Sequence, residues 1–240
     1  MFRFLKIPMM VRLPVVLCVL VLSSQAQEQD GAVKAEILTL SLSGVVSDLH
    51  YISKEGVART TVYSRGFGIP IEYEGPREIV FFRPIANPEG FSGGDREIVS
   101  RVVLPSGASR VLLLFEKIEG ADEEVYKIIP INNDLGNMPA GAYRILNLST
   151  VPFVGRIGRS RIDLAEGKTA IISDDGDENG NFEVRFFSTE KGKEGVVYSS
   201  VWQTKKTRRT TVFLLASTSD RQSIEVRKFI EPFVERKKKK

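Results

Sequence analysis

Two apolar stretches, Val111-Leu112-Leu113-Leu114-Phe115 and Val212-Phe213-Leu214-Leu215, decide the fold class of this 240-residue chain. Successive side chains of a β-strand point to opposite faces of its sheet. A run that is apolar at every position therefore predicts a strand buried on both sides. Around these runs, apolar and polar residues alternate with period two, as from Phe182 to Phe186. That alternation predicts strands with one buried face and one wet face.

Strand patterns of this kind recur along the chain, and we expect about fourteen of the candidate segments to be strands. The candidates are 35–42, 47–52, 58–65, 69–74, 77–83, 98–104, 109–116, 124–131, 142–148, 152–157, 160–164, 168–173, 182–188, 196–203, 209–216 and 223–230. Short strands separated by Gly, Pro, Asn and Asp are typical of antiparallel sandwiches. The sequence therefore predicts an all-β protein, an antiparallel β-sandwich with two immunoglobulin-like domains in tandem.

The domain boundaries follow from length and from one polar stretch. A seven-strand sandwich takes about 100 residues, so the chain has room for two. The best boundary is the turn-rich segment Asn132 to Asn137. We predict a signal peptide over 1–26, an N-terminal β domain over 27–132, a C-terminal β-sandwich domain over 133–235 and a basic tail over 236–240. One continuous larger sandwich is the alternative.

The N-terminus has the three parts of a secretory signal. Basic residues precede an apolar run from Leu13 to Leu22, and small residues lead to a cleavage position after Ala26. An uncleaved anchor is the alternative. The one cysteine, Cys18, lies inside the apolar run, so the cleaved chain has no cysteine for a disulfide or a thiolate metal site. We expect a secreted or periplasmic protein with no transmembrane span after cleavage.

The basic isoelectric point, about 9.1, comes from the two ends of the chain. The predicted signal holds three basic residues, and the tail Arg236 to Lys240 holds five. Without them, 26 basic residues remain against 30 acidic ones. The body is therefore acidic, which argues against nucleic acid as a partner.

Catalytic patterns are weak. His50 is the one histidine, and Asp48 beside it could orient the ring, but a G-x-S-x-G nucleophile elbow is absent. Trp202 alternates with Ser200 and Tyr198 along one strand face, which could stack a sugar or simply pack in a core. The stretch Lys205 to Arg209 carries four cations at a predicted hairpin tip, suited to phosphate or sulfate binding or to solubility.

An acidic loop is the one candidate metal site. Asp175, Asp177, Asn179 and Glu183 surround Gly180 in the pattern D-x-D-x-N-G-x-x-E. Alternate oxygen-bearing side chains in such a loop point to one centre, and the pattern is similar to calcium-binding β-hairpin loops of extracellular β proteins. The loop predicts a weak calcium site, the only cofactor that we consider. A solvated acidic turn with no metal is the alternative.

The stretch Met138 to Ser173 resembles uncharacterised secreted β-sandwich proteins of bacteria. The matching residues are Gly141, Tyr143, Arg144, Asn147, Leu148, Leu164 and Gly167. The resemblance implies a bacterial envelope protein with immunoglobulin-like topology and brings no catalytic residues.

Taken together, these patterns predict an exported non-enzymatic β-sandwich protein of the cell envelope with a binding or structural role. We expect its partner to be an envelope protein or a polysaccharide. Two alternatives remain. One is a carboxylate-dependent hydrolase of polysaccharide, since such an enzyme needs only two suitably spaced carboxylates. The other is an assembly factor that uses strand addition at a sheet edge.

Overall fold

A computed structural model describes residues 32–85, 96–118, 120, 124–173, 176–188, 195–217 and 224–232. All sixteen segments with a strand pattern are strands, and no helix long and apolar enough to cross a bilayer occurs in this part of the chain. The predicted signal peptide and basic tail lie outside the described residues. The strands are β1 (Val33–Ser41), β2 (Val46–Ser53), β3 (Gly56–Val62), β4 (Ile71–Gly75), β5 (Glu78–Pro84), β6 (Arg96–Val103), β7 (Arg110–Lys117), β8 (Tyr126–Asn132), β9 (Tyr143–Asn147), β10 (Phe153–Ile157), β11 (Ser160–Leu164), β12 (Thr169–Ile172), β13 (Asn181–Ser188), β14 (Gly195–Gln203), β15 (Arg208–Ala216) and β16 (Ile224–Pro232).

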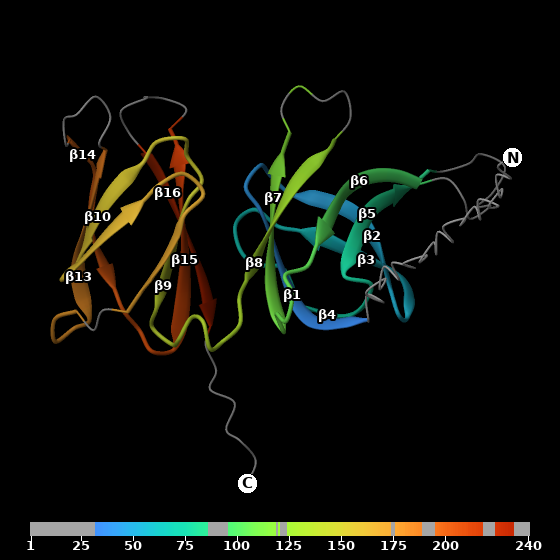
Figure 1. Ribbon diagram of the computed structural model, residues 1–240, viewed down its shortest axis with the longest axis horizontal. Helices are drawn as coiled ribbons and strands as arrows, with labels where there is room; N and C mark the ends of the chain where they lie inside the picture. The colour runs from blue at the N-terminus through green and yellow to red at the C-terminus, as the bar shows by residue number, and fades with distance from the viewer. Residues whose placement is uncertain are drawn as a thin grey trace, which may run out of the picture. The chain divides into compact units, whose positions relative to one another are not determined.

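The strands form four sheets of four, which pair into two sandwiches (Figure 1). In the first sandwich, sheet A has the order β4-β1-β7-β8 and sheet B the order β3-β2-β5-β6. In the second, sheet C has the order β12-β9-β15-β16 and sheet D the order β11-β10-β13-β14. Pairing is antiparallel except for β1 with β7 and β9 with β15. The prediction of an all-β antiparallel sandwich in two tandem domains is confirmed.

The second sandwich repeats the first strand for strand. Adding eight to each strand number of sheets A and B gives the orders of sheets C and D, and the parallel pair recurs at the same place. The likeness to immunoglobulin domains lies in the layered antiparallel architecture. The strand order is a different one, because each sandwich has four strands against four and a parallel pair at the centre of one sheet.

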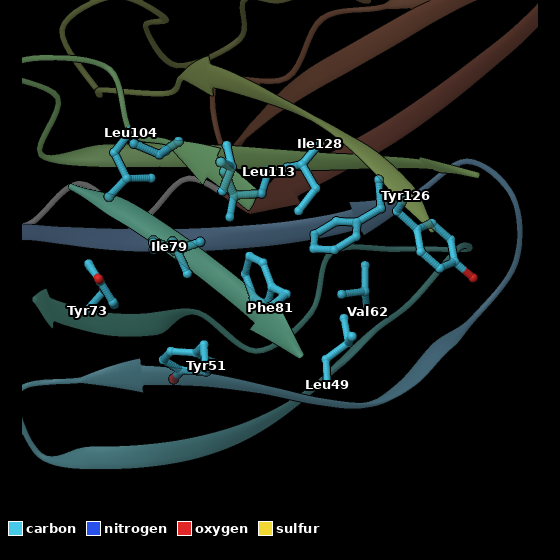
Figure 2. Close-up of a cluster of buried hydrophobic side chains, with 14 of the residues drawn as sticks. Leu49, Tyr51, Val62, Tyr73, Ile79, Phe81, Leu104, Leu113, Tyr126 and Ile128 are labelled. Atoms are coloured by element: carbon cyan, nitrogen blue, oxygen red, sulfur yellow. The ribbon is translucent and has the colours of Figure 1, made fainter. Parts of the chain in front are cut away.

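Sheets A and B enclose the first apolar core, as the period-two pattern requires (Figure 2). Phe81 of β5 meets Phe115 of β7 edge to face, with ring centroids 5.3 Å apart. Leu49 from β2 and Leu113 from β7 are fully buried in the same cluster. The residues that alternate with them along these strands face away from this core, toward solvent or toward another layer.

A second core fills the space between sheets C and D. Trp202 of β14 is 2% exposed, and its indole stacks on the ring of Tyr143 with centroids 5.1 Å apart. Phe182 and Phe186 of β13 close the cluster around it. Aromatic pairs with these offset and edge-to-face geometries stabilise a core beyond the area that they bury.

A third apolar cluster joins the two sandwiches, and it explains the two apolar runs. In β7, Val111, Leu113 and Phe115 belong to the first core, while Leu112 and Leu114 face the second sandwich. The third cluster consists of Leu38, Leu40, Leu112, Leu114, Leu146, Phe213 and Phe229, with Leu42, Phe67, Ile129, Ile131, Leu148 and Leu215 packed against it. Sheets A and C are therefore covered on both faces, as the sequence predicts for these strands.

Candidate functional site at the junction of the two sandwiches

A network of charged side chains lies next to the third apolar cluster, where the two sandwiches meet. Glu36 of β1 lies opposite Arg110 of β7, and their side chains pair with Nε to Oε1 at 2.5 Å. Arg209 of β15 lies opposite Glu231 of β16 and pairs with it at 2.5 Å, Nη2 to Oε1. Arg110 also donates through Nη1 to the same oxygen of Glu231. One carboxylate of the second sandwich thus holds an arginine from each sandwich.

Glu231 has both of its oxygens occupied. Oε1 accepts from the two arginines, and Oε2 accepts from Nδ2 of Asn133 at 3.3 Å. Its side chain is 12% exposed, and that of Arg209 is fully buried. Burial by itself disfavours the charge of Arg110, but the carboxylates of Glu36 and Glu231 outweigh it and raise the pKa of Arg110. Buried charges of this kind persist only when they are paired and hydrogen-bonded.

Arg144 of β9 is the third buried arginine, 2% exposed. Its Nη1 donates to Oδ1 of Asn133 at 2.8 Å, and its Nη2 donates to the carbonyl of Asn132 at 2.9 Å. Burial, followed by the positive charge of Arg209, lowers the pKa of Arg144 to about 10. The guanidinium is still charged at neutral pH, so it binds the end of the first sandwich to the first strand of the second.

The segment between the sandwiches is itself held by hydrogen bonds. Oδ1 of Asp134 accepts from the backbone N–H of Ser109 and of Arg110, and from the hydroxyl of Ser109. Partial burial would raise the pKa of Asp134, but these bonds outweigh it and lower the pKa below the ordinary value. The polar stretch after β8 is therefore anchored to the start of β7.

A cavity of about 820 Å³ opens beside this network. Its polar lining includes Lys34, Glu36, Glu72, Arg110, Asp134 and Glu231. Glu36 and Glu231 are already bound to Arg110, and the Ser109 hydroxyl, also in the lining, donates to Asp134. These groups are committed to one another, so the arrangement suits mechanical coupling of the sandwiches more than proton transfer to a substrate.

The predicted calcium loop is described in part, since Asp175 lies outside the described residues. Oδ1 of Asp177 accepts from the backbone N–H of Asn179 at 2.8 Å and of Asn181 at 2.9 Å, which lowers its pKa. Glu183 is exposed and pairs with Arg185 at 3.0 Å. Among the described residues no group of three or more His, Cys, Asp or Glu side chains could hold a metal ion. Asp177 and Asn179 thus share one turn, and the calcium site stays a prediction.

The other residues considered for chemistry have structural surroundings. Trp202 lies in the second core, where its Nε1 donates to the Tyr198 hydroxyl at 3.2 Å. The His50 ring stacks on Phe82 at 5.9 Å between centroids. Asp48 pairs with Arg59 at 2.9 Å. Trp202 thus packs in the core, and Asp48, two residues before His50, is paired with Arg59.

The prediction of a cationic hairpin tip from Lys205 to Arg209 is wrong. β14 belongs to sheet D and β15 to sheet C, so the connection crosses between layers. Arg209 points into the junction, and Nη2 of Arg208 donates to the carbonyl of Gln203 at 3.0 Å. Sequence reasoning missed Arg209 and Arg144 as junction residues. For Arg144 the available signal was a single arginine in a mostly apolar strand, since a charge there must have a buried partner. Arg209 follows another arginine, so its sequence carried no such signal.

Comparisons with known proteins assign no family. No family model matches the chain, and no curated protein matches it. Among solved structures it is similar to a proposed cell adhesion protein from Bacteroides eggerthii DSM 20697, with 8% identity and a TM-score of 0.22, over 83% of this chain and 96% of that one. A TM-score this low carries no argument about function.

Proposed function

We propose that the chain is an exported, non-enzymatic protein of the cell envelope, secreted or periplasmic, in which two sandwiches act as one unit with a binding or structural role. The signal pattern that ends at Ala26 supports export. The absence of cysteine from the chain after that position means that its stability would not depend on the redox state of its compartment.

The junction is the observation that carries this proposal. An apolar cluster and a buried ionic network both cross from one sandwich to the other, through Leu112 against the Phe213 cluster and Arg110 with Glu231. Domains that merely share a linker have smaller and more polar contacts and move relative to each other. A fixed pair presents its loops and sheet edges in a constant arrangement, which suits recognition of an envelope protein or a polysaccharide.

Two measurements test the proposal. The full chain is expressed with its own N-terminus in a bacterial host, and the envelope and soluble fractions are sequenced from the N-terminus. We expect a mature chain that begins at Gln27 outside the cytoplasm. A chain that retains Met1 in the cytoplasm overturns the localisation.

The second measurement concerns activity and coupling. We expect no release of reducing sugars from a panel of envelope polysaccharides, and release that depends on Glu36 or Glu231 would overturn the non-enzymatic role. During urea unfolding, the fluorescence of Trp202 reports on the second sandwich alone, while far-ultraviolet circular dichroism reports on both. Coincident transitions are expected for one coupled unit, and separate transitions would contradict it.

A further inference from the structure

Seven of the eight edge strands carry a feature that discourages pairing with another chain. Such features are short length, charged side chains and proline. β12 has four residues, β8 contains Lys127 and Pro130, and the others carry at least one charge. β14 differs, because its nine residues, GVVYSSVWQ, include no charge and no proline. It is the last strand of sheet D (Figure 1).

The backbone of β14 has hydrogen-bonding groups directed away from its sheet. The N–H of Thr204 donates to the carbonyl of Gly180, so position 204 is turned toward β13. Along an antiparallel strand, residues whose backbone groups bond to the neighbouring strand alternate with residues whose backbone groups point away from it. Trp202 and Ser200 therefore bond to β13, while Val201 and Ser199 direct N–H and C=O to the open edge. Among the described residues no backbone group pairs with that edge.

A register shift limits the open edge to one part of the strand. Phe186 lies opposite Tyr198 and Phe187 opposite Val196, so Val197 is an extra residue in a bulge. Bulges hinder further pairing. The regular segment is therefore Tyr198–Gln203, long enough for a short added strand.

The inner side of this edge is basic. A cavity of about 230 Å³ lies between sheets C and D here, lined by Trp202, Arg208 and Lys228 among others, with no carboxylate in its lining. Nζ of Lys228 lies 5.3 Å from the centre of the Trp202 ring. No described carboxylate forms an ion pair with Lys228 or Arg208. A strand added to β14 would direct every second side chain to the inner side of sheet D, and the side chain opposite Trp202 would lie next to these two cations.

We propose that β14 accepts an extended segment of a partner protein as a fifth strand of sheet D, antiparallel to Tyr198–Gln203, with apolar inward side chains and one carboxylate next to Lys228. The proposal rests on the binding role above and names its partner class. Charge favours this occupant over a second copy of the chain, because two copies paired through β14 would bring the Lys228 and Arg208 cations of both toward one interface.

The probe is a capped seven-residue peptide, TETVTVT, whose glutamate would lie opposite Trp202 and whose valines would lie opposite Ser200 and Tyr198. Trp202 is the one tryptophan of the chain, so its fluorescence reports directly on this edge. We expect a saturable change in emission. A peptide with lysine in place of glutamate should bind at least about tenfold more weakly, a difference of about 1.4 kcal/mol.

Variants separate backbone pairing from charge. Val201→Pro removes an outward N–H and keeps the bonds to β13, as proline is tolerated on an open edge. Binding should disappear while circular dichroism and melting temperature stay unchanged, and Val201→Thr should bind like the wild type. A peptide N-methylated at its third and fifth residues should not bind, which covers the case in which Val201→Pro fails to fold.

Lys228→Met should weaken the preference of the protein for a peptide with glutamate over one with glutamine, and Arg208 would account for any preference that remains. Three results would overturn the proposal: no fluorescence change with TETVTVT at millimolar concentration, equal binding of the N-methylated peptide, or a concentration-dependent dimer that Val201→Pro abolishes. None of them bears on export or on the lack of activity, so the proposed function would stand or fall separately.

Discussion

Replacing Glu231 with alanine tests the junction most directly. The substitution removes the one carboxylate that holds Arg110 and Arg209 together, and it removes the acceptor of the Asn133 amide. Arg209 has no exposed side-chain surface, so water cannot replace the lost partner without opening the junction. Removing one partner of a buried pair costs about 3–5 kcal/mol, because it leaves an uncompensated charge.

That cost is a large part of the stability of an ordinary domain, about 5–15 kcal/mol. Urea unfolding of the mature chain, followed by circular dichroism, gives the difference in free energy of unfolding. Glu78→Ala is the matched control, because Glu78 forms a 3.8 Å pair with Arg101 in which both side chains are more than half exposed. An exposed pair of this kind should contribute about 1 kcal/mol or less.

Salt provides the second control. Since buried pairs are screened little, the cost of Glu231→Ala should be nearly the same in low and high salt. A cost below about 1 kcal/mol, or one that vanishes in 1 M salt, is what a solvated surface pair would give. Either result would refute the role assigned to this network.

Three further predictions concern other contacts. Leu112→Ala, at a fully buried position of the third cluster, should cost about 2–5 kcal/mol in urea unfolding; an unchanged midpoint would mean that the sandwiches do not pack through this face. Because hydrogen bonds lower the pKa of Asp134, its contribution is present above the unfolded pKa, about 3.9, and is lost as pH falls through the lower folded value. The stability gap between wild type and Asp134→Asn should therefore be constant above about pH 5 and narrow below that unfolded pKa; a gap independent of pH would contradict this. Asp177→Ala should lower the melting temperature in EDTA, since the two backbone bonds need no metal; the calcium interpretation further requires that millimolar Ca²⁺ raise the melting temperature of the wild type alone.

The strands could be predicted from the sequence because their signal is local. Period-two alternation identified segments such as Phe182–Phe186, and runs such as Val111–Phe115 indicated strands covered on both faces, which the third cluster explains. The sheet membership of each strand could not be predicted in this way. Consecutive strands β14 and β15 belong to different sheets, and no feature of the four residues between them indicates that the chain passes from one sheet to the other.

The contacts of the junction could not be predicted from local sequence patterns either. Arg110 and Glu231 are 121 positions apart, and the partners of Arg144 are backbone and amide groups of a polar stretch. A charge in a strand indicates that some partner exists, but the identity of the partner depends on the tertiary fold. Local patterns can also mislead. The pattern L-x-x-G occurs at Leu104 to Gly107, between β6 and β7, and at Leu164 to Gly167, between β11 and β12, which are positions that the repeat does not relate.

The repeat has a consequence for the junction itself. Sheets A and C are equivalent in strand order, and both contribute side chains to the apolar cluster between the sandwiches, as the matching faces of two copies would in a homodimer. The parallel pairs end alike, since the N–H of Leu42 donates to the carbonyl of Phe115 and the N–H of Leu148 donates to the carbonyl of Leu214. Counting back along these registers, Arg110 corresponds to Arg209, and their antiparallel neighbours Asn133 and Glu231 correspond to each other. Two identical subunits would carry the same residue at both positions, so two carboxylates or two amides would meet at a shared interface. A covalent tandem is released from that identity, so a carboxylate in one half can accept a hydrogen bond from an amide at the matching position of the other.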